Sequence, residues 1–374
     1  MPLAKCRVAF LLPDFSAGGS ERVLLQLAAH LTPPYQPALI VLRDRGPLRS
    51  LVPDGMPVVD LGSDRLRTSV LGLRRALMEM KPQIVVSSMG YMNLMAAAVL
   101  RTLPLQTGLV LREANTPAST LAALPAWLPA RMAYRLLYQR ADLVLCNAEH
   151  VRSALTGLGV EAARIAHLPN PVNERAIRAQ AEFTATGDSE PPHVIAVGRL
   201  VRQKGFDRLI DGIAAAQGVP FTVTIIGEGP ERADLEQRVL HAELRQTIRL
   251  AGYSDSPWRS MAASAGLVMT SRWEGFPNVA LEALACGRPV FALAEVPGLA
   301  ELRERAGADW VRLYPDMAAL LDGLGRHCAT GAAMPRALGP SRLPHIYRDD
   351  AVCLEFRRQL DGIMRNRRDL FGPA

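Results

Sequence analysis

The chain has few cysteines, and none of them is spaced for a disulfide framework or a zinc site. No two stand in a Cys-x-x-Cys pair and their number is odd, which favours a protein of a reducing compartment. The cysteines are Cys6, Cys146, Cys286, Cys328 and Cys353.

Long apolar runs are also missing. No apolar stretch approaches the roughly 20 residues that a helix needs to cross a bilayer. The apolar run Val8–Leu12, behind Lys5 and Arg7, is too short for the core of a secretory signal peptide. We therefore expect a cytoplasmic protein that is not integral to a membrane.

Net charge is absent from one half of the chain and concentrated in the other. Residues 1–172 carry a net charge of +7, whereas residues 173–374 sum to zero. A basic surface can bind nucleic acid, an anionic membrane or an anionic substrate. Because no helix-turn-helix, RNA-binding or zinc-finger pattern accompanies the charge, we expect no nucleic-acid partner.

Short apolar runs alternate with helical patterns along both halves of the chain. The first half opens with an expected strand at Arg7–Leu12 and a helix at Ser20–His30, and the second with a strand at Val194–Gly198 and a helix at Phe206–Ala216. This alternation predicts an α/β fold with two doubly wound, Rossmann-like parallel sheets. Two such domains facing each other would form a cleft beyond the carboxyl ends of their strands, where ligands bind. Further strands are expected at Ala38–Leu42, Val58–Leu61, Ile84–Ser87, Gly108–Leu111, Leu143–Cys146, Phe221–Gly227, Ile248–Ala251, Leu267–Thr270 and Pro289–Leu293.

The boundary between the halves is expected at the proline-punctuated turn Leu168–Val172 and the polar stretch that follows it up to Pro192. This predicts an N-terminal domain over residues 1–172 and a C-terminal domain over residues 173–350. An apolar helical pattern at Ala351–Arg365 predicts one more helix near the end of the chain.

The most specific motif is Glu-Gly-Phe-Pro-Asn-Val-Ala-Leu-Glu, residues 274–282, between an expected strand and a helix. Its turn would direct backbone N–H groups and the positive end of the helix dipole into the cleft, which makes an anion site. Glu274 and Glu282 would lie near that anion, where carboxylates can accept hydrogen bonds from sugar hydroxyls. The alternative is a capped helix with ordinary surface glutamates. The turn and first helical residues are Gly275, Phe276, Pro277, Asn278 and Val279.

A second motif, Gly-Arg-Leu-Val-Arg-Gln-Lys-Gly at residues 198–205, also lies between a strand and a helix. Its glycines allow close approach to a ligand, and Arg199 and Lys204 can contact a diphosphate, one as a planar fork and the other as a point charge. A solvated surface loop is the alternative.

Two glycine turns complete the set. Gly227-Glu-Gly-Pro230 follows an expected strand but lacks the third glycine of a dinucleotide fingerprint. Gly18 and Gly19, after the first strand, have N–H groups that could face a leaving phosphate or an acceptor. Plain turn packing is the alternative for both.

Together these motifs resemble the retaining glycosyltransferases of family 4, which have the GT-B fold. Their order along residues 15–295 matches that family. The resemblance implies that Arg199 and Lys204 hold the donor diphosphate, that Glu282 holds the ribose, and that Glu274 holds hydroxyls of the donor sugar. It also implies retention of anomeric configuration, and a last helix, about residues 351–374, that packs back on the N-terminal domain.

The chain departs from that family at one place. Many members have a histidine near the transferred sugar, but no histidine occurs between residues 31 and 149 here. The matching stretch holds Arg112, Glu113 and Asn115, which become candidates for the sugar or acceptor side. A buried structural salt bridge is the alternative.

No Asp-x-Asp pair and no nucleophile with a partner base is present, so we expect neither a metal nor another cofactor. Arg199, Lys204 and backbone N–H groups would stabilise the leaving diphosphate instead, and Glu274 would complete the catalytic set at the donor sugar. The resemblance implies transfer of a hexose or N-acetylhexosamine from a nucleotide-diphosphate sugar to a glycan. UDP is the first choice because it is frequent in that family, and a lipid-linked, lipopolysaccharide or polysaccharide acceptor is expected. The alternatives are a nucleotide-sugar epimerase of the same fold and an inactive nucleotide-sugar-binding subunit.

Two basic, apolar segments of the first half could lie on the inner face of the cell membrane, which would make the enzyme peripheral. They are Leu66–Lys81 and Ser119–Arg140, the second with Trp127, Tyr134 and Tyr138 among its arginines. Aromatic and cationic side chains together favour an anionic headgroup layer. Two ordinary packed helices with solvated arginines are the alternative.

Overall fold

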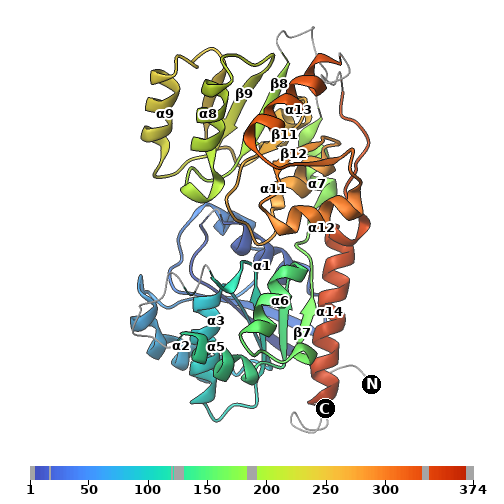
Figure 1. The fold of residues 1–374 in the computed structure, drawn as a ribbon. Helices are drawn as coiled ribbons and strands as arrows, with labels where there is room; N and C mark the ends of the chain where they lie inside the picture. Colours follow the sequence, from blue (N-terminus) through green and yellow to red (C-terminus); the bar gives the residue numbers. More distant parts are fainter. Residues whose placement is uncertain are drawn as a thin grey trace. The chain divides into compact units, whose positions relative to one another are not determined.

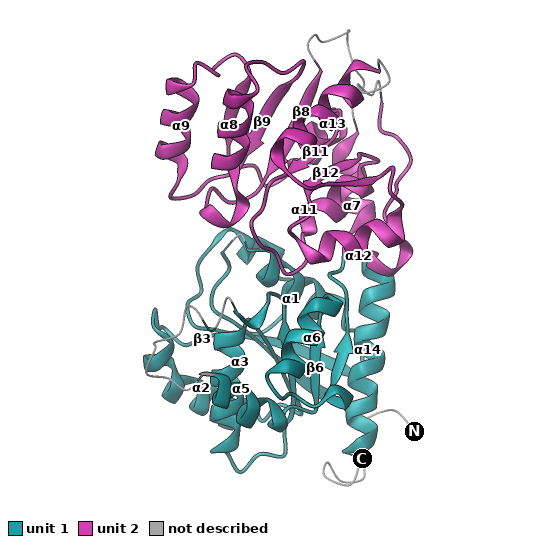
Figure 2. Ribbon diagram, in the orientation of Figure 1, with its two compact units in different colours: residues 1–171, 349–374 teal, residues 172–348 magenta. Residues whose placement is uncertain are grey.

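The computed structural model describes residues 5–16, 18–118, 121, 130–182, 192–330 and 337–367. The chain forms two compact units, which Figure 2 colours separately. One comprises residues 1–171 with 349–374, and the other residues 172–348. Each unit contains one sheet with helices packed against it (Figure 1), and every strand pair in both sheets is parallel. This confirms the prediction of two parallel α/β sheets.

The first unit has a seven-stranded sheet in the order β3-β2-β1-β4-β5-β6-β7. Its central strands are mainly apolar because helices cover both faces of a doubly wound sheet. The strands are β1 (Cys6–Leu12), β2 (Tyr35–Val41), β3 (Val58–Asp60), β4 (Ile84–Ser88), β5 (Gly108–Glu113), β6 (Leu143–Cys146) and β7 (Ile165–His167). The helices between them are α1 (Gly19–Ala29), α2 (Leu66–Met80), α3 (Gly90–Arg101), α5 (Ala130–Leu137) and α6 (Glu149–Gly157).

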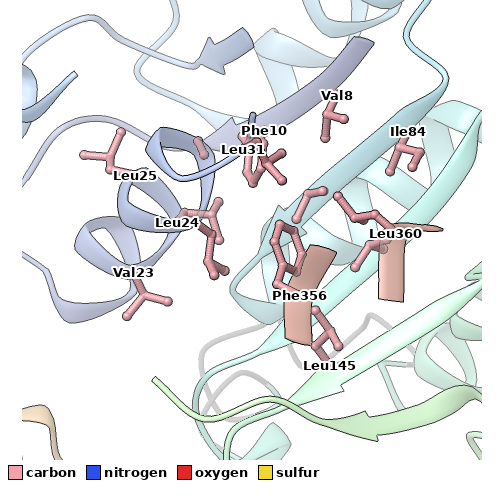
Figure 3. Close-up of a cluster of buried hydrophobic side chains, with 14 of the residues drawn as sticks. Val8, Phe10, Val23, Leu24, Leu25, Leu31, Ile84, Leu145, Phe356 and Leu360 are labelled. Carbon is pink, nitrogen blue, oxygen red and sulfur yellow. The ribbon is translucent and has the colours of Figure 1, made fainter. Parts of the chain in front are cut away.

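The long final helix α14 (Asp349–Asn366) belongs to this first unit. Figure 3 shows its Phe356 and Leu360 among side chains of the N-terminal sheet and of α1. The ring centroids of Phe10 and Phe356 are 6.2 Å apart. Full burial of such side chains contributes roughly 1.5–3 kcal/mol each. At the polar margin, Tyr35 donates a hydrogen bond of 2.5 Å to Asp361.

The second unit has a six-stranded sheet in the order β10-β9-β8-β11-β12-β13. Its strands are β8 (His193–Val197), β9 (Thr222–Ile226), β10 (Ile248–Gly252), β11 (Leu267–Met269), β12 (Val290–Leu293) and β13 (Val311–Tyr314). Its helices are α7 (Glu174–Ala181), α8 (Phe206–Ala215), α9 (Arg232–His241), α10 (Trp258–Ala262), α11 (Asn278–Ala285), α12 (Pro297–Ala306) and α13 (Met317–Ala329). Because β9, β8 and β11 are neighbours, the loops that follow them emerge side by side at one edge of the sheet.

All five cysteines lie in the described residues, are buried, and form no disulfide with one another. Among the helices that the structure describes, none is both long and apolar enough to cross a bilayer.

Candidate functional site

Three loops at the carboxyl edge of the second sheet carry the motifs of that half. Residues 198–205 follow β8, residues 227–230 follow β9, and residues 270–277 follow β11 and lead into α11. Backbone hydrogen bonds join them, since Leu200 N donates to Glu228 O at 2.9 Å and Arg272 N donates to Gln203 O at 2.8 Å. In doubly wound sheets this edge is where ligands bind.

Lys204 and Glu274 meet at the centre of this loop cluster. Lys204 Nζ donates to Glu274 Oε1 at 2.5 Å, and the two side chains are 18% and 8% exposed. The pair is therefore largely shielded from water, where a charge-assisted hydrogen bond is stronger than on the surface. The cation expected to bind a phosphate and the carboxylate expected to bind sugar hydroxyls thus lie in direct contact.

Two further side chains fix the Glu274 carboxylate. Ser271 Oγ donates to Oε1 at 2.8 Å, and Gln203 Nε2 donates to Oε2 at 3.3 Å and to the Trp273 carbonyl at 2.9 Å. Among the described residues, every hydrogen bond to the carboxylate thus comes from one of these two loops. Sequence reasoning missed Ser271 and Gln203, although the three-residue spacing from Ser271 to Glu274 was a possible signal.

Close backbone packing holds the loops against one another. Gly205 has φ +67°, and a Cβ there would lie 2.1 Å from the Thr270 carbonyl oxygen. Gly227 has φ +156°, and a Cβ there would lie 1.8 Å from the Gly198 carbonyl oxygen. A side chain at either position would push the loops apart. Glycine is therefore required both because another backbone segment packs so closely and because φ is positive.

Helix α11 begins at Asn278 after the turn Gly275–Pro277, and Val279 lies in its first turn. Phe276 is buried, and its ring centroid lies 5.3 Å from that of Tyr347. The N–H groups of a first helical turn have no partner within the helix, and with the helix dipole they attract an anion. This turn leads from Glu274, so the anion-attracting end of α11 adjoins the Lys204–Glu274 pair in sequence.

The other two residues expected in the donor site, Glu282 and Arg199, do not hydrogen-bond the Lys204–Glu274 pair within the described residues. Glu282 is one turn further along α11, where Trp258 Nε1 donates to its Oε2 at 3.1 Å. No sequence pattern pointed to Trp258. Arg199 is exposed, and among the described residues its side chain has no hydrogen bond or ion pair, so its guanidinium is available to a ligand.

In the first unit, Gly18 caps α1 and Gly19 is its first residue. The carboxylate of Glu21 lies directly against Gly18, and Ser16 Oγ donates to Glu21 Oε1 at 3.4 Å. The N-terminal end of this helix therefore already has an anionic group beside it, as its dipole favours.

Arg112 and Glu113 are adjacent in β5 and are both buried, so their side chains extend to opposite faces of the sheet. Arg112 Nη2 donates to Asn170 Oδ1 at 2.5 Å and Nη1 donates to Ser88 Oγ at 3.3 Å. Burial lowers the pKa of Arg112 to about 10. Among the described residues no carboxylate hydrogen-bonds Arg112, so the buried salt bridge is not the arrangement found. Asn115, two residues beyond β5, is exposed.

Glu113 is enclosed by polar side chains from α3, from α5 and from the short 3-10 helix that follows α5. Its Oε1 accepts hydrogen bonds from Tyr138, from Tyr134 at 3.1 Å and from Asn93 at 3.3 Å. Burial raises the pKa of this carboxyl to about 7, although these donors and Arg112 oppose the shift.

The same contacts correct the expectation that Tyr134 and Tyr138 face a membrane. Both rings are fully buried and stacked, with centroids 4.6 Å apart, because their hydroxyls reach Glu113 inside the unit. Trp127 lies outside the described residues. The exposed apolar side chains of α5 are instead Met132 and Leu136.

No group of three or more His, Cys, Asp or Glu side chains that could hold a metal ion occurs within the described ranges.

Comparison with known proteins agrees with this architecture. A glycosyl transferase 4-like domain matches residues 18–171, and the domain of glycosyl transferases group 1 matches residues 179–323. The chain therefore belongs to the glycosyltransferases of GT-B architecture, and its N-terminal half is of the family 4 type, as the motifs predicted. It is thus a glycosyltransferase enzyme.

Two curated relatives show how far the likeness extends. A lipopolysaccharide core biosynthesis glycosyltransferase of Rhizobium meliloti is 29% identical over 43% of this chain, and the match spans 46% of that relative's length. The N-acetylgalactosamine-N,N'-diacetylbacillosaminyl-diphospho-undecaprenol 4-alpha-N-acetylgalactosaminyltransferase of Campylobacter jejuni is 25% identical over 79% of this chain and 83% of its own.

Solved structures share the fold. HepE from Anabaena, in complex with UDP-glucose, matches with a TM-score of 0.76 at 18% identity, over 95% of this chain and 99% of its own. The apo form of the lipopolysaccharide outer core galactosyltransferase WaaB matches with a TM-score of 0.68 at 18% identity, over the same shares of the two chains. At this identity the likeness establishes the GT-B fold.

Proposed function

We propose that the protein transfers a hexose or N-acetylhexosamine from a UDP-sugar to a glycan acceptor, with retention of anomeric configuration. The contact between Lys204 and Glu274, at the carboxyl edge where three motif-bearing loops converge, carries this proposal. It puts a group for the diphosphate beside a group for the sugar, as the donor's own chemistry requires.

Each group of the site has a part in binding the donor. The Lys204 ammonium has three donor hydrogens, so it can keep its bond to Glu274 and still donate to a phosphate oxygen. Arg199 supplies a second cation from its exposed position, and the first turn of α11 supplies N–H groups. Glu274 accepts hydrogen bonds from sugar hydroxyls, and Glu282, held by Trp258, accepts those of the ribose.

In the proposed reaction, the bond between the anomeric carbon and the diphosphate oxygen breaks while the acceptor oxygen bonds that carbon on the same face. The acceptor's proton goes to the leaving diphosphate oxygen. Negative charge grows on that oxygen, and in this proposal Lys204, Arg199 and the α11 N–H groups stabilise it in place of a metal ion.

The acceptor is proposed to be lipid-linked or part of a lipopolysaccharide or polysaccharide. Supporting this, one relative is named for a diphospho-undecaprenol acceptor and another for lipopolysaccharide core biosynthesis. The +7 charge of residues 1–172 would favour such anionic acceptors.

We also propose that the first unit meets the inner face of the cell membrane through α5 and α2. On α5 the exposed Met132 and Leu136 are four residues apart, and the exposed Arg131 and Arg135 flank them. On α2, Leu71 is exposed beside basic residues. Attraction of about 1 kcal/mol per basic residue near an anionic surface would give reversible, salt-sensitive binding. Sedimentation with vesicles of rising anionic lipid content, at low and high salt, tests this. Equal and negligible binding to neutral and anionic vesicles at low salt would contradict it.

The function itself is tested with purified protein, UDP-, GDP- and ADP-sugars, and an undecaprenyl-diphosphate-linked glycan. We expect UDP release that depends on the acceptor, and NMR of the product should show the anomeric configuration of the donor. Conversion of the sugar without an acceptor would instead identify an epimerase. Donor binding without any turnover would instead identify an inactive nucleotide-sugar-binding subunit.

A further inference from the structure

A bidentate ion pair joins the first turn of α8 to a loop of the proposed donor site. Arg272 Nη1 and Nη2 donate to Asp207 Oδ1 and Oδ2 at 2.8 and 2.6 Å. Asp207 lies in the first turn of α8, just after the 198–205 loop, and Arg272 lies in the loop that follows β11. The side chains are 24% and 23% exposed, so this pair is better shielded and more rigid than an ordinary surface pair.

Arg272 also donates hydrogen bonds to the backbone of the two residues that precede Lys204. Its Nη1 donates to the Arg202 carbonyl at 2.8 Å, and its own N–H donates to the Gln203 carbonyl at 2.8 Å. Arg272 thus contacts the chain before and after Lys204. Within the described residues, neither Arg272 nor Asp207 hydrogen-bonds Lys204 or Glu274 directly.

The pair therefore acts on the donor groups through the loops that carry them. Lys204 is three residues before Asp207, and Glu274 is two residues after Arg272. A lysine side chain gives up about 2 kcal/mol of rotamer entropy when it is fixed, and a site that is already ordered avoids that loss when ligand binds. Small displacements of such groups weaken binding and slow turnover.

We propose that Arg272 and Asp207 are positioning residues for the donor site, which hold Lys204 and Glu274 in register for the nucleotide diphosphate. This inference rests on the proposed function, because it assigns the pair a purpose within that site. Asp207 is suited to the role, since the hydrogen bond from Arg272 keeps its pKa below the ordinary value and the carboxylate ionised.

The next residue of α8 offers a control pair, whose carboxylate acts on Arg272 only through its charge and forms no hydrogen bond with it within the described residues. Arg208 forms a bidentate pair with Glu295, with distances of 2.8 and 2.6 Å, and the side chains are 25% and 45% exposed. This pair links α8 to the segment after β12, whereas the Arg272–Asp207 pair links it to the loop of Glu274. Loss of either pair removes one bidentate bond from the same unit, but only the Arg272–Asp207 pair reaches a loop of the donor site.

The experiment compares Asp207→Asn and Arg272→Lys with Glu295→Gln. Titration calorimetry with UDP gives Kd, and steady-state transfer gives KM and kcat for the UDP-sugar. Thermal melting reports stability. We expect Kd and KM to rise about tenfold in Asp207→Asn and in Arg272→Lys. Asparagine has only one acceptor oxygen and lysine has no guanidinium, so neither variant can form the bidentate bond. Glu295→Gln should lower the melting temperature by about as much as Asp207→Asn and Arg272→Lys do, but it should leave Kd within twofold of wild type.

Three results would overturn the inference. If Kd in both Asp207→Asn and Arg272→Lys stays within twofold of wild type, the pair has no positioning role. If Glu295→Gln weakens UDP binding as much as they do, the effect is general loss of stability. If wild-type protein binds none of UDP, GDP and ADP, the proposed function fails and the inference fails with it. Arg272→Lys keeps the charge, so it provides the comparison if Asp207→Asn does not fold.

Discussion

Replacing Glu274 by glutamine should strengthen nucleotide binding and slow sugar transfer. The change keeps the shape of the side chain and removes its charge. Ser271 can still donate to the amide oxygen, but the 2.5 Å ion pair with Lys204 is lost. A charge-assisted hydrogen bond contributes about 1.5–3 kcal/mol, and we expect a loss of stability near the lower end because Lys204 is 18% exposed.

UDP should nevertheless bind this variant more tightly. With Lys204 between them, the Glu274 carboxylate and a bound diphosphate would lie about 7 Å apart, and at an effective dielectric constant of about 20 two like charges there repel by roughly 2 kcal/mol. Screening and the added mobility of Lys204 reduce the gain, so we expect Kd for UDP to fall about three- to tenfold. Transfer should fall at least about 100-fold, since the sugar loses its charged hydrogen-bond acceptor.

Titration calorimetry with UDP and a transfer assay measure the two effects, with Glu295→Gln as a control that removes one carboxylate elsewhere in the unit. UDP affinity that is unchanged or weaker in folded Glu274→Gln protein would refute the reasoning. The carboxylate would then not oppose the diphosphate, and Lys204 would not be the cation that binds it.

Three more outcomes are expected. Arg199→Ala and Lys204→Ala should each lower donor turnover at least about 100-fold, because each removes a charged contact to the diphosphate. Only Lys204→Ala should also lower the melting temperature, since it leaves Glu274 buried without its cation, and activity within threefold of wild type in both variants would remove these residues from the site. Transfer should persist in excess EDTA, and complete loss that manganese or magnesium restores would reveal a missed metal site. Stability should fall between pH 5 and 8 because of Glu113, whose pKa is raised to about 7 in the folded protein. Its protonated carboxyl stabilises the fold most below the unfolded pKa, and this contribution is lost as the pH rises through 7. Glu113→Gln should flatten this part of the profile in denaturant unfolding, and an unchanged slope would show that Glu113 is not its source.

The sheets and the position of the donor loops could be predicted because they depend on local pattern. Apolar runs alternating with helical stretches define parallel strands, and a motif placed between a strand and a helix must lie at the carboxyl edge. The contact between Lys204 and Glu274 could not be derived this way. The two are 70 positions apart and meet because β8 and β11 are neighbours, which only the strand order shows.

Burial was harder to predict than position along the chain. Helical spacing shows that Tyr134 and Tyr138 share a face with each other, but not whether that face is covered. In the structure Glu113 draws both hydroxyls inward, so the basic, apolar segment places its tyrosines in the interior and leaves Met132 and Leu136 outside. Trp258 escaped notice because its partner, Glu282, is brought near by packing alone.

The packing of α14 on the first unit has a consequence for synthesis of the chain on the ribosome. The second unit is continuous, residues 172–348, and can fold as soon as it has emerged. The first unit cannot, because its core includes Phe356 and Leu360, and 358 positions separate Cys6 from its contact Met364. The N-terminal sheet, which is made first, must therefore wait with an uncovered apolar face until the last helix is released. In this protein the half that is translated first is completed last, and during that interval it is the half most open to chaperones and to aggregation.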